Sequence, residues 1–103
     1  MSEKDRNIEY MVEFVLPEFL DEKMTKTIPA QRKFVERYFQ TGKLLSYTLA
    51  ADRSKLWSVF YCQSEAELIN LIEKMPMTRY FDYNYHEILF HEMTKLFPGF
   101  SNN

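Results

Sequence analysis

The 103-residue sequence has little glycine, little cysteine and no long apolar run. With only Gly42 and Gly99, it has no glycine-rich phosphate loop, and it has no G-x-S-x-G nucleophile motif. Cys62 is its single cysteine, so an internal disulfide is impossible and a buried, inert thiol is expected. No run of about 18 apolar residues is present, and no apolar stretch follows a basic N-terminus. The sequence therefore predicts a soluble, cytoplasmic protein outside the nucleotide-binding and covalent-hydrolase classes.

The sequence also lacks a large excess of either positive or negative charge. Thirteen basic residues face fifteen acidic ones, the formal net charge is −2, and no basic block stands out. This balance gives no reason to expect nucleic acid or an anionic membrane as a partner. Hydrophobic residues make up 46% and aromatic residues 17%, which is enough for the core of one domain.

The first regular element expected is a strand that starts near residue 8 and is closed by Pro17. Its residues alternate with period two, which is typical of a strand whose two faces differ. One face carries Tyr10, Val12, Phe14 and Leu16. The other face carries Glu9, Met11, Glu13 and Val15.

A helix is expected next, over about residues 21–41. Its apolar stripe at helical spacing consists of Gln31, Phe34, Val35, Tyr38 and Phe39. Gly42 suits the position after the helix end. Pro29 either starts the regular helix or kinks a longer one that begins near Asp21, and we favour the longer, kinked helix.

The remaining elements are a hairpin, a second helix and a last strand. Two runs rich in β-forming residues, 44–50 and 55–62, flank the turn-type residues 51–54. Ser64 with Glu67 forms a capping box for a helix that Pro76 ends. A final strand is expected over about 82–91.

The predicted order is strand, helix, strand, strand, helix, strand. This order predicts a ferredoxin-like βαββαβ fold of the α+β class, with a four-stranded antiparallel sheet and two helices on one face. The opposite face is too apolar to be left in water, so we expect a second copy to cover it in a homodimer. We place the domain at residues 8–92, after a loose N-terminus (1–7) and before a C-terminal tail (93–103).

The same chain resembles the muconolactone isomerase family of the dimeric α/β-barrel superfamily, from about Glu9 to His91. The resemblance rests on Leu16-Pro17, Gly42, Ser58-Val59-Phe60, Ser64, Leu68, Pro76, Tyr80, Asp82 and His91. It implies a barrel that holds a small organic ligand and a cofactor-independent isomerase, and it permits a higher assembly of dimers as well as a single homodimer. Members that act on muconolactone carry tryptophan, arginine and histidine on the first hairpin strand, where this chain has residues 44–49, Leu-Leu-Ser-Tyr-Thr-Leu. A changed substrate is therefore expected.

Candidate proton carriers lie on the first and last strands. If the apolar face of the first strand meets the helices, Glu9 and Glu13 point into the barrel, where a carboxylate could shuttle a proton without a metal. His86 and His91 are natural acids or bases, and His91 matches the family pattern. An ion pair with the partner subunit or plain exposure would equally explain the glutamates, and structural hydrogen bonding would explain the histidines. No set of residues has metal-ligand spacing.

Aromatic residues are the candidates for ligand contact: Tyr47, Trp57, Tyr83 and Tyr85. Most of the aromatic residues are expected in the core or the dimer interface, and a few could line a cavity. These candidate residues are compatible with three functions. They are an isomerase of lactones or aromatic-breakdown compounds, a non-catalytic binding or assembly protein, and a cofactor-independent monooxygenase.

Overall fold

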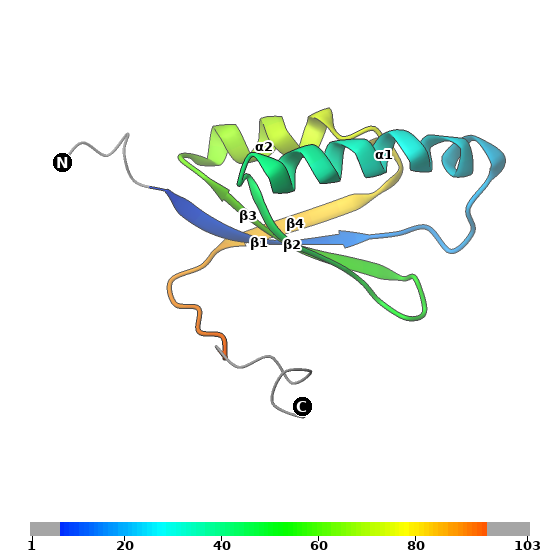
Figure 1. Cartoon of the computed structure of the whole chain (residues 1–103). Coiled ribbons are helices and arrows are strands. Elements are labelled where there is room, and N and C mark those ends of the chain that lie inside the picture. The colour runs from blue at the N-terminus through cyan, green and yellow to red at the C-terminus, as the bar shows by residue number, and fades with distance from the viewer. Residues whose placement is uncertain (1–6, 95–103) are drawn as a thin grey trace, which may run out of the picture.

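The computed structural model describes residues 7–94, which form one four-stranded antiparallel sheet with two helices on a single face (Figure 1). The elements in chain order are β1 (Ile8–Val15), α1 (Glu22–Gln40), β2 (Leu44–Leu49), β3 (Lys55–Cys62), α2 (Glu65–Lys74), the 3-10 turn η2 (Thr78–Tyr80) and β4 (Asp82–Glu87). The strand order is β2-β3-β1-β4, with β1 and β3 in the centre. This confirms the predicted ferredoxin-like α+β fold.

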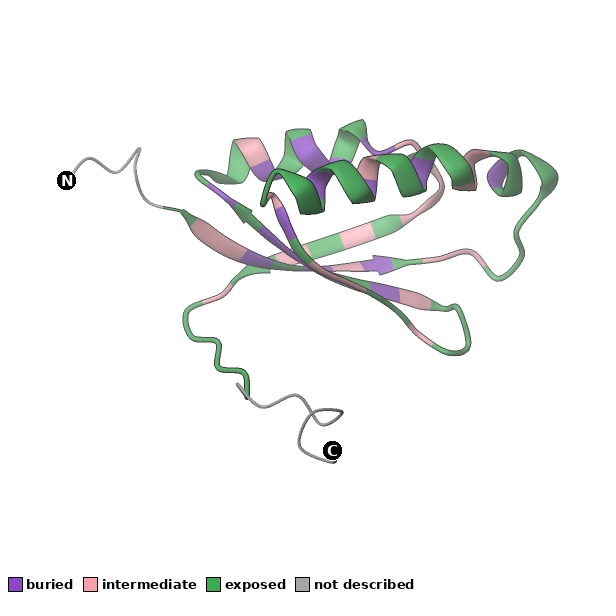
Figure 2. Ribbon diagram, in the orientation of Figure 1, coloured by how far each residue is buried: buried purple, intermediate pink, exposed green. Residues whose placement is uncertain are grey.

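The core lies between the sheet and the two helices (Figure 2). Tyr10, Val12 and Phe14 of β1 are almost fully buried there, as the alternation predicted. Leu16, just beyond the strand end, is partly buried against the same core. From the helices, Val35 and Tyr38 of α1 and Leu68, Leu71 and Ile72 of α2 meet them. An unbroken apolar row on a central strand is what two amphipathic helices require.

Helix α1 runs without a break through Pro29, so the longer of the two predicted helices is the one observed. The Asp21 carboxylate caps it by accepting from the Met24 N–H at 2.9 Å. Pro29 has no N–H, so the helix lacks one backbone hydrogen bond there. Gly42 follows the helix with a φ of 76°, a conformation that glycine adopts at low cost.

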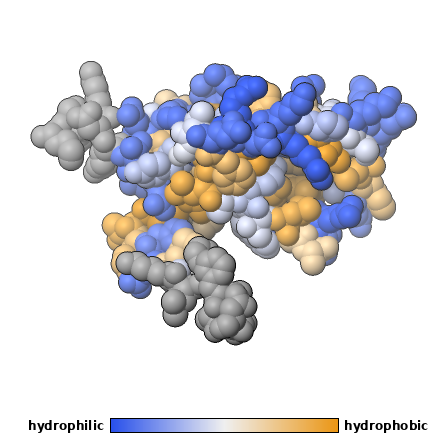
Figure 3. All heavy atoms as spheres, viewed as in Figure 1, coloured by the Kyte–Doolittle hydropathy of each residue, from blue (hydrophilic) through white to orange (hydrophobic). Residues whose placement is uncertain are grey.

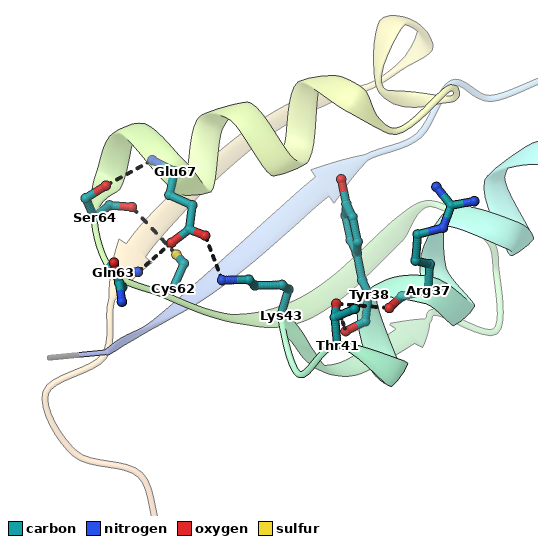
Figure 4. A network of polar contacts seen from close by, with 8 residues as sticks. All are labelled: Arg37, Tyr38, Thr41, Lys43, Cys62, Gln63, Ser64 and Glu67. Carbon is teal, nitrogen blue, oxygen red and sulfur yellow. Dashed lines mark hydrogen bonds and ion pairs between the residues drawn. The ribbon is translucent and has the colours of Figure 1, made fainter. Parts of the chain in front are cut away.

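A polar network joins the start of α2 to Lys43, which lies between α1 and β2 (Figure 4). Ser64 caps α2 by accepting from the Glu67 N–H, as predicted. The Glu67 carboxylate accepts from the Gln63 N–H at 2.7 Å and from Lys43 at 2.7 Å. Burial opposes ionisation of Glu67, but these hydrogen bonds outweigh it and lower the pKa of the carboxyl.

Cys62 is buried beside this network, and burial, reinforced by the Glu67 charge, raises the pKa of its thiol to about 11. The predicted burial of Cys62 is therefore confirmed, and a raised pKa opposes formation of the reactive thiolate.

The β2–β3 hairpin contains an irregularity that matters for the site. Leu44 lies opposite Phe60 and Ser46 lies opposite Val59, so Leu45 is an extra residue, a β-bulge. Beyond the bulge, Tyr47 pairs with Ser58 on the helix side of the sheet. Without the extra residue, alternation from Leu44 would turn Tyr47 to the other face.

The last strand is shorter than predicted. β4 ends at Glu87, not near His91, and one further backbone hydrogen bond runs from the Ile88 N–H to the Glu9 carbonyl. The pairing of β4 with β1 ends at Glu87, opposite Tyr10, although β1 itself extends to Ile8. Residues 1–6 and 95–103, which hold most of the two predicted terminal segments, lie outside the described residues. Within residues 7–94, no helix has the length and apolar character needed to span a bilayer.

Candidate functional site

The predicted site residues divide between the two faces of the sheet. Those of the first strand, Glu9 and Glu13, lie on the face without helices, together with Trp57 and His86. We call this face the open face. Tyr47, Tyr83 and Tyr85 lie instead on the helix side.

On the open face, the Glu13 carboxylate has both a hydrogen-bond partner and an ion-pair partner. Its carboxylate accepts from the Trp57 indole N–H at 3.0 Å, and the Lys55 ammonium lies 3.7 Å away. The Lys55 ammonium of the same chain is therefore a cationic partner of Glu13. His86 lies opposite Met11 and Glu13 lies opposite Asn84, so the two candidate proton carriers are diagonal neighbours on adjacent strands.

His91 lies beyond β4, in the segment that follows it. Its Nδ1 is 3.2 Å from a carboxylate oxygen of Glu9. The pair borders a hollow of about 410 Å³ that Tyr61 and Glu87 also line. The described residues hold no group of three metal-ligating side chains, here or elsewhere.

The helix-facing tyrosines of β4 are engaged by α2. The Tyr83 hydroxyl donates to Glu73 at 2.8 Å, and the Tyr85 hydroxyl donates to Glu65. Partial burial and the neighbouring Glu73 raise the pKa of Tyr83 to about 12. These two phenols hold the edge strand against α2, and neither lines the larger of the two hollows.

The larger pocket lies between α1 and the sheet, at the end where the hairpin turns. It encloses about 820 Å³. We call it the helix–sheet pocket. Its apolar walls include Ile28, Val35, Phe39, Leu49, Leu56 and Phe81. Hydrophobic side chains reach the surface below α1 at this end of the molecule (Figure 3).

Two polar side chains meet inside the helix–sheet pocket. Gln31 of α1 is 5% exposed, and its amide nitrogen donates to the Tyr47 hydroxyl at 3.0 Å. The same amide donates to the Met75 sulfur at 3.6 Å and accepts from the Met77 N–H at 3.0 Å. Four exposed charged residues complete the lining: Glu18, Arg32, Glu36 and Arg53.

Of the predicted ligand-contact residues, only Tyr47 lines this pocket, and the rest of its lining was not predicted from the sequence. Two cationic side chains, Arg32 and Arg53, line this pocket, whereas the first hairpin strand carries none. One signal was available in the sequence: Gln31 is the only polar member of the predicted apolar stripe of α1, and a polar residue there must find a buried partner.

The fold and the pocket place the chain in the class of ferredoxin-like α+β domains with a small-molecule-sized cavity. The chain matches the muconolactone delta-isomerase family over residues 8–92, and it belongs to that family. No curated protein sequence gives a match to it.

Proposed function

We propose that this protein is a homodimer that binds a small organic molecule in the helix–sheet pocket and acts as a cofactor-independent isomerase of a lactone or aromatic-breakdown compound. The observation that carries the proposal is the pocket itself: about 820 Å³, with apolar walls that converge on the buried Gln31–Tyr47 pair. Sites for small molecules have this size and this combination of apolar surface with few placed polar groups. Membership in an isomerase family supports the reaction class.

The chemistry of such a reaction needs only a proton carrier. A double-bond shift removes a proton from one carbon and delivers a proton to another carbon of the same molecule, so no electrons are gained or lost. In the pocket, the carboxylates of Glu18 and Glu36 are the groups that could take the proton. Glu13 and His86 could serve only in a chamber formed between two open faces.

The direct test is the conversion of α-angelica lactone, a small β,γ-unsaturated lactone, to its α,β-unsaturated isomer in D₂O. We expect acceleration of at least about 100-fold over buffer, the lower end for general acid–base catalysis, with deuterium at the carbon that receives the proton. Proton NMR follows both the isomer and the label. Glu18→Gln and Glu36→Gln identify which carboxylate takes part, because each keeps the side-chain size and removes the charge.

A non-catalytic binding protein is the second candidate. The observation that favours it is the chemistry of the buried end of the pocket, where an amide and a phenol stand while both lining carboxylates are exposed. Ligand binding at the pocket without isomerisation or deuterium incorporation would decide for this candidate.

Muconolactone itself should be a poor substrate. The first hairpin strand lacks the tryptophan, arginine and histidine expected from the family resemblance, and the two arginines of the pocket are matched by two glutamates. We expect turnover below about 1% of the usual enzyme median of about 10 per second. Loss of the substrate is measured by NMR, with α-angelica lactone in parallel as the control. Turnover near about 10 per second would contradict the prediction.

The homodimer is proposed from the open face. Met11, Val15, Trp57 and Tyr61 are each 37–40% exposed on it in the single chain. Together they give the two central strands an apolar surface that a second copy would cover. Glu13 and Lys55 form an ion pair on this face, so neither of these two charges would be buried without an opposite charge beside it.

A further inference from the structure

The orientation of the Gln31 amide is fixed by a backbone group. The Met77 N–H lies 3.0 Å from the Gln31 side-chain oxygen, and a backbone N–H can only donate. The amide oxygen must therefore face Met77, and the amide nitrogen must face Tyr47 and Met75. Both N–H groups of the amide are used as donors, so Gln31 offers Tyr47 no acceptor.

This orientation decides the direction of the hydrogen bond at Tyr47. The phenol oxygen accepts from Gln31, so its own hydrogen points elsewhere. Among the described residues, no acceptor for that hydrogen is found, and Tyr47 lines the helix–sheet pocket. Burial raises the pKa of Tyr47 despite the opposing effect of the Gln31 hydrogen bond, so the phenol is protonated at neutral pH. The result is a chain of donors, from Met77 through Gln31 to Tyr47, that ends at the pocket.

The charged residues of the pocket do not add a preference for an ion. Arg32 and Arg53 carry two positive charges, and Glu18 and Glu36 carry two negative charges. All four are exposed, where water screens them. The half-buried phenol is therefore the group that can discriminate among ligands.

We propose that the helix–sheet pocket selects a neutral, largely apolar ring compound whose carbonyl oxygen accepts from the Tyr47 hydroxyl. Gln31 is the positioning residue that keeps the phenol hydrogen directed to the ligand. This inference rests on the proposed function, because it assumes that the pocket is the ligand site, and it names the chemical class of the ligand.

The test compares two bicyclic probes of one skeleton, 1-tetralone, which has a carbonyl, and tetralin, which has none. Each is titrated into the ¹⁵N-labelled full chain, and the backbone amide signals of Gln31, Leu56 and Met77 report the pocket. We expect 1-tetralone to bind about 2- to 12-fold more tightly than tetralin, the range for one net hydrogen bond. Tyr47→Phe should remove this preference and leave the affinity for tetralin unchanged.

Gln31→Glu separates positioning from packing. In its ionised form a carboxylate in place of the amide has nearly the same shape and still accepts from the Met77 N–H, but it also accepts from the Tyr47 O–H. The titrations of this variant and of the wild-type chain are made at about pH 9, because burial raises the pKa of a carboxyl. The phenol hydrogen should then turn to the carboxylate, and the preference for 1-tetralone should fall as it does in Tyr47→Phe. A residue that only fills space would leave the preference unchanged.

The outcomes separate the two proposals. Equal affinities of the wild-type chain for the two probes, or a preference that survives Tyr47→Phe, would overturn the inference about the donor while the pocket remains a binding site. If neither probe moves the pocket signals, the pocket does not bind such compounds, and the proposed function is overturned together with the inference.

Discussion

Replacing Phe60 by alanine should lower the free energy of unfolding by about 3–5 kcal/mol, the usual cost of removing a buried phenylalanine side chain. Phe60 is fully buried on the central strand β3. Its ring meets that of Tyr38 edge to face, with centroids 6.2 Å apart. Domains of this size are stable by only about 5–15 kcal/mol, so the loss is a large share of the total.

The loss of stability should exceed the cost of the cavity that the Phe60 side chain leaves. The Tyr38 hydroxyl donates to the Leu71 carbonyl at 2.6 Å, which joins α1 to α2. With Phe60 gone, the Tyr38 ring loses the surface that fixes its position, and this bond weakens. At about 4–8 °C per kcal/mol, the midpoint of thermal unfolding should fall by on the order of 20 °C.

Circular dichroism at one fixed protein concentration measures this change, because dimerisation would make the midpoint depend on concentration. Phe19→Ala is the matched control, since the same side chain is removed from a residue that is 79% exposed. Its cost should stay below about 1 kcal/mol. Equal shifts for the two variants would show that the core assigned to Phe60 is wrong.

The order of the helices and strands, and the faces that they bury, could be predicted from the sequence because both depend on strong local patterns. In β1, an uninterrupted alternation places Tyr10, Val12 and Phe14 toward the helices, and burial of all three confirms it. The start of α2 was equally predictable, since Ser64 and Glu67 satisfy the first N–H groups through short-range contacts.

The pocket could not be predicted in the same way. Tyr47 reaches it because Leu45 is an extra residue in β2, and a bulge between two β-forming residues has no distinct sequence signal. The length of β4 was overestimated for a related reason. Pairing ends opposite Tyr10, where the chain leaves the sheet although β1 continues to Ile8, and the pattern of residues 82–91 does not contain this departure.

Replacing Met11 by aspartate should convert the proposed dimer to a monomer. Met11 lies on the central strand β1, opposite Val59 and His86, and is 40% exposed in the single chain. The variant should fold, because an aspartate there stays in water. In a dimer, each copy would bury a new carboxylate at the centre of the interface at a cost of several kcal/mol. The dissociation constant should therefore rise by about 100-fold or more.

Multi-angle light scattering from about 1 to 100 micromolar protein measures this change. Ile69→Asp is the matched control, because Ile69 is 37% exposed on α2, the helix layer on the other side of the sheet. That variant should remain dimeric like the wild-type chain, since the same charge is added away from the open face. A wild-type chain that is monomeric throughout this range would overturn the proposed dimer. A Met11→Asp variant as dimeric as the control would show that copies associate through another surface, and Glu13 and His86 would then face water and not a closed chamber.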